Sequence, residues 1–208
     1  MRTIIVNAER SYEIVIGCDW RESLAPFLRE RSRVAIVISS KMLIHFKPID
    51  FPGVSILLFE VPDGESGKNA RTLESLWERL GAEGFTRSDL VVAIGGGATT
   101  DIAGFAAATW LRGIDWIAIP TTLAGMVDAS VGGKTGMNSE FGKNLIGSFH
   151  SPAGVLVDLS WLSTLSDRDF AAGLAEVVKT GFIADKKIIE MLTSKSISQV
   201  RESPELTE

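Results

Sequence analysis

The stretch Leu90-Val91-Val92-Ala93-Ile94-Gly95-Gly96-Gly97-Ala98-Thr99-Thr100-Asp101 joins a continuous apolar run to a glycine triplet. A short apolar run of this kind indicates a strand that is covered on both faces, as in a parallel sheet. Because glycine has no Cβ, the triplet lets a ligand approach the backbone where the next helix begins. The amides and the dipole of a helix N-terminus attract anions, which favours a phosphate or pyrophosphate site here.

The same stretch matches the common dinucleotide-binding fingerprint poorly. Thr100 stands where a third glycine is expected after Gly95 and Gly97, and the stretch follows the fourth or fifth predicted strand instead of the first. A glycine triplet also occurs in tight structural turns. Taken alone, it leaves a ligand site and a structural turn as alternatives.

Strands and helices alternate on both sides of the triplet. Apolar residues at helical spacing predict a helix between residues 69 and 80, and small apolar residues predict a buried helix over 102–111. Such alternation is typical of βαβ units. We therefore predict an α/β fold with a Rossmann-like, mainly parallel sheet, helices on both faces and an N-terminal β-hairpin. The predicted strands are residues 3–6 and 12–16, which form the hairpin, and residues 34–38, 55–59, 90–94, 116–120 and 155–158.

The pattern changes after Leu165. Apolar residues from Phe170 to Phe182 follow a helical period, and no strand pattern follows Val157. We predict an α/β domain over residues 1–165 and the start of an all-α domain over residues 166–208. For the polar tail from Ser196 to Glu208, we predict no clear helix or strand.

Composition narrows the function classes. The formal net charge of −5 argues against binding to duplex DNA or other nucleic acid. No apolar run approaches the ~18 residues of a membrane span, so we expect no membrane association. The single cysteine, Cys18, cannot form an internal disulfide, which favours the cytoplasm.

A dense polar cluster lies between residues 120 and 147. Pro120-Thr121-Thr122 ends a strand, and Asp128, Lys134, Lys143 and Asn144 follow among glycine and hydroxyl residues. Lysines on glycine-rich loops can contact phosphates or carboxylates. We therefore predict loops that form a binding site at the end of the sheet.

Other charged residues carry weaker signals. The segment from Asp63 to Lys68 is a strand-to-helix loop with both charge signs, and taken alone it favours a surface turn. Glu176 and Lys179 share a helix face, where partial burial is expected. His150 follows the cluster and is a candidate for the site, whereas His45 is expected at the surface.

Taken together, these segments resemble the 3-dehydroquinate synthase family of sugar phosphate cyclases. The resemblance runs in order from about Tyr12 to Phe182. Its motifs are Asp63-Gly64-Glu65-Ser66-Gly67-Lys68, Gly95-Gly96-Gly97-Ala98-Thr99-Thr100-Asp101, Pro120-Thr121-Thr122, Gly132-Gly133-Lys134-Thr135-Gly136-Met137-Asn138, Gly142-Lys143-Asn144-Leu145-Ile146-Gly147-Ser148-Phe149-His150 and Ala175-Glu176-Val177-Val178-Lys179.

The resemblance implies an NAD-binding α/β domain, an α-helical metal and substrate domain, and an active site between them. A phosphorylated keto acid, 3-deoxy-D-arabino-heptulosonate 7-phosphate, would be converted to 3-dehydroquinate with loss of phosphate, in the shikimate pathway. NAD would oxidise a hydroxyl transiently, and zinc, or another divalent metal such as cobalt, would polarise the reacting oxygens. The full-length form is expected to be a homodimer.

The resemblance also implies roles for individual residues. Glu176 would be a metal ligand, and Arg112 would reach the substrate phosphate across a dimer interface. Asp128, Lys134, Asn144 and Lys179 would face the substrate. The implied cofactor-binding residues are Asp63, Gly64, Glu65, Lys68, Gly96, Gly97, Thr99, Thr100, Asp101, Thr121, Thr122, Lys134, Lys143, Trp161, Leu162, Ser163 and Thr164.

Two departures from the family pattern matter. Ser39-Ser40 stands where the family often has an acidic or amide residue that meets the adenosine. The family also has a longer helical domain with a histidine-rich motif, and no histidine follows His150 here. We therefore expect an incomplete metal site and an inactive isolated chain. The alternatives are another sugar phosphate cyclase, a glycerol-dehydrogenase-like oxidoreductase, or a non-catalytic NAD-binding or interaction domain.

Overall fold

The computed structural model describes residues 1–203. Within them, a seven-stranded sheet has the order β1-β2-β9-β6-β5-β3-β4, and every neighbouring pair is parallel except the hairpin β1–β2. The predicted α/β fold with a mainly parallel sheet and an N-terminal hairpin is confirmed. The strands are β1 (Arg2–Asn7), β2 (Ser11–Ile16), β3 (Arg33–Ser39), β4 (Ser55–Val61), β5 (Leu90–Gly95), β6 (Asp115–Pro120) and β9 (Gly154–Val157).

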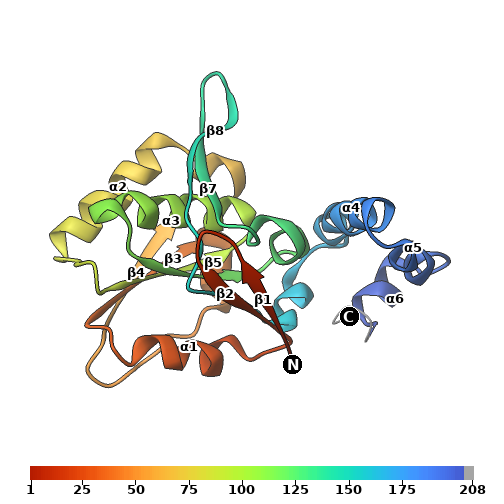
Figure 1. Ribbon diagram of the computed structural model, residues 1–208, viewed down its shortest axis with the longest axis horizontal. Coiled ribbons are helices and arrows are strands. Elements are labelled where there is room, and N and C mark those ends of the chain that lie inside the picture. The colour runs from red at the N-terminus through yellow and green to blue at the C-terminus, as the bar shows by residue number, and fades with distance from the viewer. Residues whose placement is uncertain (204–208) are drawn as a thin grey trace.

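Helices cover both faces of this sheet. Figure 1 shows α1 (Trp20–Leu28) on one face, and α2 (Ala70–Ala82) and α3 (Gly97–Thr109) on the other. All six residues of β5 are buried, as expected of a strand covered from both sides. The α1 helix was not predicted from the sequence, although Asp19 caps its N-terminus and Trp20, Leu24 and Leu28 are buried at helical spacing.

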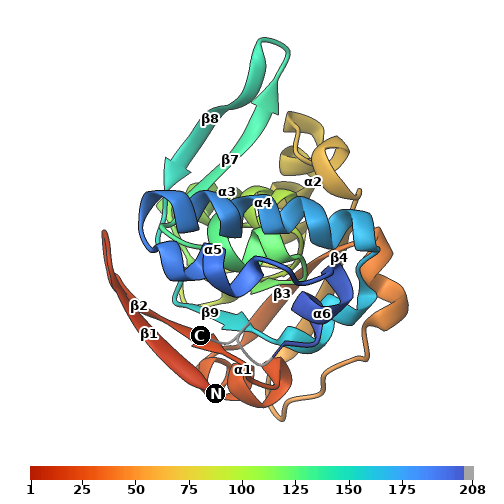
Figure 2. The ribbon, with the colours of Figure 1, turned by 90° about the vertical axis from the view of Figure 1, so that its right-hand side faces the viewer.

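A second, two-stranded sheet corrects the prediction of glycine-rich loops over residues 132–147. Strands β7 (Lys134–Ser139) and β8 (Gly142–Phe149) pair antiparallel, and we call this ribbon the β7–β8 arm. Gly136 lies opposite Gly147, and a Cβ on Gly147 would lie 2.2 Å from the carbonyl oxygen of Thr135. These glycines therefore allow close strand pairing. Both views show the arm extending away from the main sheet (Figures 1 and 2).

Helices follow the last strand, as predicted. They are α4 (Asp167–Ile183), α5 (Lys186–Leu192) and α6 (Ile197–Arg201). The α6 helix corrects the expectation of a tail without a clear element: Ser196 and Gln199 form a capping box, a pattern that sequence analysis overlooked. Residues 204–208 of that tail lie outside the described residues. The predicted domain boundary between residues 165 and 166 stays a prediction.

Short helical turns connect the main elements and carry several candidate site residues. The turns are η1 (Ser40–His45), η2 (Gly64–Gly67), η3 (Trp110–Arg112), η4 (Gly125–Ala129) and η5 (Leu159–Thr164).

Among residues 1–203, no helix has the length and apolar character that a membrane span requires.

Candidate active site

The glycine triplet lies at the junction of β5 and α3, at the carboxyl end of the parallel sheet. Gly96 is the N-cap of α3, and no side chain of residues 1–203 caps this helix end. The amides of Thr99 and Thr100 bond back to the carbonyl oxygen of Gly96. An uncapped helix N-terminus attracts an anion through its remaining amides and its dipole.

Packing inside the protein also requires glycine in this triplet. A Cβ on Gly95 would lie 2.6 Å from the side chain of Thr99, and a Cβ on Gly97 would lie 2.8 Å from the Cβ of Ala129 in η4. Packing therefore supports the structural-turn alternative, and with an uncapped helix N-terminus at the same place the ligand site stays a prediction.

A cleft of about 610 Å³ opens beside this helix end. The η2 segment, α3, η4 and the β7–β8 arm together form its walls. Of the predicted site residues, Glu65, Lys68, Gly97, Asp101, Asp128, Lys134 and Asn144 line it. Lining residues without a predicted role are Ala98, Ala129, Val131, Thr135, Gly136, Leu145, Gly147, Ser148 and Phe149.

Lys68 is the most buried charged residue of the cleft, with its side chain only 2% exposed. Its ammonium donates hydrogen bonds to the carboxylate of Asp101, on α3, and to Oδ1 of Asn144, on β8. Burial raises the pKa of the Asp101 carboxyl, against the opposing effect of the Lys68 hydrogen bond and charge. Lys68 therefore ties η2, α3 and the arm together at one point.

A second charged group lies where α4 approaches η4. Lys179 donates a hydrogen bond to Glu176, and its Nζ lies 3.8 Å from the Asp128 carboxylate. The hydrogen bond to Glu176, with the charge of Asp128, raises the pKa of Lys179. The expected partial burial holds for Glu176, whereas Lys179 is exposed. Because Asp128 also lines the cleft, this group extends the polar surface towards the helical segment.

The described residues do not assemble a metal site. Within residues 1–203, no three His, Cys, Asp or Glu side chains come close enough together to hold a metal ion. His150 does not line the cleft, because its Nε2 contacts the carbonyl oxygen of Ile114 at 2.8 Å. The exposed position expected for His45 is confirmed.

Several predicted cofactor residues lie behind the cleft wall. Thr99 and Thr100 are buried in α3, and Thr100 donates a hydrogen bond to the carbonyl oxygen of Gly97. Thr122 accepts a hydrogen bond from the amide of Gly125. The hydroxyl of Thr121 is buried without a hydrogen-bond partner among the described residues. Thr121 does not line the cleft, so its hydroxyl is a buried group with an unmet hydrogen bond at this strand end.

Other predicted residues lie at the edges of the site or away from it. Lys143 lies 4.0 Å from the Glu65 carboxylate, and Asp63 accepts a hydrogen bond from the amide of Lys41. Trp161 in η5 is buried and stacks on Trp20. The other cofactor-binding residues implied by the resemblance also do not line the cleft; they are Gly64, Gly96, Leu162, Ser163 and Thr164.

Arg112 is exposed and does not line the cleft. Its φ is 66°, and that of the neighbouring Leu111 is 49°. Two successive residues other than glycine in the left-handed region are costly, so the surrounding structure must hold this turn in place.

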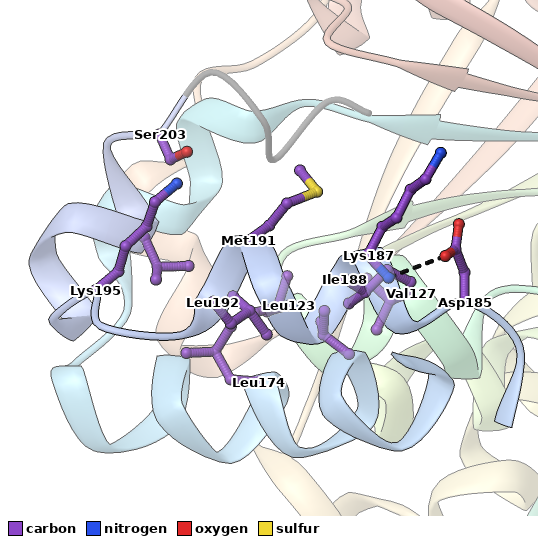
Figure 3. A pocket seen from close by; sticks show the side chains of 12 residues that line it. Leu123, Val127, Leu174, Asp185, Lys187, Ile188, Met191, Leu192, Lys195 and Ser203 are labelled. Carbon is purple, nitrogen blue, oxygen red and sulfur yellow. Dashed lines mark hydrogen bonds between the residues drawn. The ribbon is translucent and has the colours of Figure 1, made fainter. Parts of the chain in front are cut away.

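A second cavity, of about 410 Å³, lies among the helices that follow the sheet (Figure 3). Leu123, Leu174, Ile188 and Leu192 gather in it, and Lys187 and Lys195 lie at its edges. This lining is mainly apolar, and none of the predicted site residues belongs to it. It does not resemble a phosphate site.

The family comparison bears directly on this arrangement. Residues 58–172, which supply most of the cleft wall, match the family model of the 3-dehydroquinate synthase N-terminal region. The chain belongs to the 3-dehydroquinate synthase family. The 3-dehydroquinate synthase of Mycobacterium leprae is 47% identical over 194 residues, which are 91% of this chain and 54% of that protein. The chain spans about half the length of the curated relatives that it matches.

Solved structures of sugar phosphate cyclases share the fold. A 2-epi-5-epi-valiolone synthase from Streptomyces hygroscopicus, solved with NAD⁺ and Zn²⁺, superposes with a TM-score of 0.84 at 30% identity, over 100% of this chain and 59% of that one. A 2-deoxy-scyllo-inosose synthase, solved with carbaglucose-6-phosphate, NAD⁺ and Co²⁺, has a TM-score of 0.76 at 29% identity, over 86% of this chain and 51% of that one. The predicted resemblance to the family is confirmed.

Proposed function

We propose that the full-length protein is a 3-dehydroquinate synthase, which converts 3-deoxy-D-arabino-heptulosonate 7-phosphate to 3-dehydroquinate and phosphate. The observation that carries the proposal is the cleft in which an uncapped helix N-terminus meets Lys68, Lys134 and Asn144. Its amides and cations suit a ligand with several anionic groups. The 46–48% identity to named 3-dehydroquinate synthases favours this reaction over those of the cyclases at 29–30% identity.

NAD fits the sheet end of this cleft. Gly97 and Ala98 line the cleft, and their backbone amides would bind the pyrophosphate, while Asp101 would accept a hydrogen bond from a ribose hydroxyl. The unpaired hydroxyl of Thr121 would find its partner in the cofactor. When bound, NAD supplies reversible hydride transfer. The protein's part is to hold cofactor and substrate in contact.

The substrate side of the cleft is polar on both walls. The ammonium groups of Lys134 and Lys179 would bind substrate phosphate or carboxylate, and Asn144 would orient a hydroxyl. Asp128 lies within reach of Lys179 and is a candidate proton acceptor near that end. We infer that these groups position one substrate through successive steps.

A homodimer and a metal belong to the proposal for the full-length protein. Arg112 is exposed and outside its own cleft, which fits a residue that serves the partner subunit. Glu176 is the proposed ligand of a zinc or cobalt ion. Residues 1–203 do not bring a set of three metal ligands together, so the remaining ligands would have to come from outside them. A cytoplasmic location stays a prediction.

Two measurements test the proposal. Calorimetry of the 208-residue chain should detect NAD binding, and Asp101→Asn should weaken it. The full-length product of the gene, supplied with NAD and Zn²⁺, should release phosphate from the heptulosonate phosphate. Absence of NAD binding at millimolar cofactor would favour a non-catalytic domain. Release of phosphate from other sugar phosphates only would indicate a different cyclase, and net accumulation of NADH would indicate a dehydrogenase.

A further inference from the structure

The β7–β8 arm forms one wall of the cleft while it extends away from the main sheet (Figures 1 and 2). Every residue of β8 after Gly142 is exposed, and Phe141 at the turn is 92% exposed. Side-chain burial therefore contributes little to the position of β8. Packing of β7 on α3 and the pairing of β8 with β7 place the base of the arm, and polar contacts with the body add to these near Lys143 and Asn144.

Those contacts converge on the segment from Glu65 to Lys68. The backbone amide of Asn138, on β7, donates a hydrogen bond of 2.8 Å to the carbonyl oxygen of Lys68. Its side-chain amide donates a second bond to the Glu65 carboxylate. From the other strand, Asn144 accepts a hydrogen bond from the Lys68 ammonium. Asn138 thus contacts the body through both its backbone and its side chain.

Asn138 also joins the two strands of the arm. The regular pairing of β7 with β8 is interrupted between Met137 and Ser139, which leaves Asn138 outside the ladder. Its Oδ1 accepts a hydrogen bond of 3.0 Å from the backbone amide of Asn144. Asn144 has a φ of 59°, in the left-handed region that few residues other than glycine adopt. The bond from Asn138 holds this unusual backbone in place.

We propose that Asn138 is a positioning residue that fixes Lys143 and Asn144 over the cleft. Its amide side chain is used at both ends, because Oδ1 accepts from Asn144 and Nδ2 donates to Glu65. Only a side chain with a donor and an acceptor can make both bonds. The inference rests on the proposed function, since Lys143 and Asn144 act on cofactor and substrate only if that function holds.

The donor and acceptor pattern provides a specific test. Asn138→Asp keeps the acceptor for the Asn144 amide but places a carboxylate against the Glu65 carboxylate, which repels the arm. In the double variant Asn138→Asp with Glu65→Gln, the hydrogen bond between the two side chains can form again in the opposite direction, because the glutamine amide can donate to the new carboxylate. Ser139→Ala is the matched control: its hydroxyl bonds only within the tip of the arm, to Gly142 and Phe141.

Hydrogen exchange of the 208-residue chain, with no cofactor present, tests the contact. Asn138→Asp should speed exchange over residues 142–147 by about tenfold, as expected for the loss of a hydrogen bond to a charged group. The Glu65→Gln double variant should recover most of the protection, and Ser139→Ala should match the wild type. Unchanged exchange in Asn138→Asp, or no recovery in the double variant, would overturn the proposal.

Calorimetry with NAD separates this inference from the proposed function. If wild-type chain binds NAD, Asn138→Asp should weaken binding by about tenfold and Ser139→Ala should not. Equal affinity of wild type and Asn138→Asp would show that the arm's position does not matter for the cofactor and would overturn the positioning role. If wild type does not bind NAD, the proposed function fails, and the exchange data alone decide the contact.

Discussion

Replacement of Lys68 by methionine probes the most buried charge of the cleft. Methionine keeps most of the side-chain volume and removes the ammonium, so the two hydrogen bonds to Asp101 and Asn144 are lost. The carboxylate of Asp101, 19% exposed, then stays in a largely buried position without its cation. The cost of the substitution should therefore come mainly from Asp101.

The size of the expected loss in stability follows from the burial of the ion pair between Lys68 and Asp101. Removal of one partner from a fully buried ion pair costs roughly 3–5 kcal/mol, because the remaining charge is uncompensated. Asp101 keeps some contact with water, which lowers the cost. We expect Lys68→Met to reduce the free energy of unfolding by about 2–3 kcal/mol at pH 7.

The loss should depend on pH with a defined sign. Burial already raises the pKa of Asp101, and without Lys68 the opposing contributions disappear, so the pKa rises further. A raised folded-state pKa means that the folded state binds the proton more readily than the unfolded state. The variant's stability should therefore fall as pH rises from about 4 and recover as pH is lowered, with a slope of up to about 1.4 kcal/mol per pH unit.

Urea denaturation at a series of pH values measures both quantities. The double variant Lys68→Met with Asp101→Asn is the control, because an amide needs no counter-charge, and its stability should depend less on pH than that of Lys68→Met. A loss below about 1 kcal/mol at pH 7 would refute the reasoning. So would a Lys68→Met curve parallel to that of the double variant across the pH range.

Two further predictions concern stability away from the cleft. Burial raises the pKa of Asp115, but hydrogen bonds from Arg10 and Arg31 outweigh it and lower the pKa overall. Asp115→Asn should therefore lower the free energy of unfolding by about 1 kcal/mol above pH 5. This difference from wild type should vanish as the wild-type carboxyl is protonated below pH 4. Urea denaturation curves that give the same difference at every pH would contradict the prediction. Phe170, at the start of α4, is fully buried. Phe170→Ala should cost about 3–5 kcal/mol, and thermal unfolding within a degree or two of wild type would contradict it.

The sequence predicted the sheet well because its strands have a simple pattern. The runs that became β3 and β5 are apolar on both faces and rich in β-branched residues, which together with their shortness favours a covered parallel strand. The arm was missed for the opposite reason. Gly136 and Gly147 suggested loops by composition, whereas their lack of a Cβ lets the two strands meet. A glycine therefore has different meanings in a turn and in a strand pair.

Part of the site could be predicted because its motifs are local in the sequence. The contacts between the motifs could not be predicted, because they join segments that are far apart in the sequence. Lys68 and Asp101 were chosen from separate motifs, but nothing in either motif predicts that one buried ammonium bonds both Asp101 and Asn144. The contact between Glu65 and Asn138 joins positions 73 residues apart, so a single sequence gives no sign of it. Along β8, Asn144, Leu145, Gly147, Ser148 and Phe149 all line the cleft, so no simple alternation in the sequence marks this wall.

The place of β9 in the sheet has a consequence for the order of synthesis. Strand β9 is the last strand of the sheet along the chain, yet it lies between β2 and β6, which precede it. Until residues 154–157 have left the ribosome, the N-terminal hairpin and the block formed by β3 to β6 have no shared neighbour. Once β6 has been made, the nascent chain carries two unpaired strand edges, on β2 and β6, until β9 follows, which exposes it to misassembly. Insertion of one four-residue strand then closes both edges in a single late event.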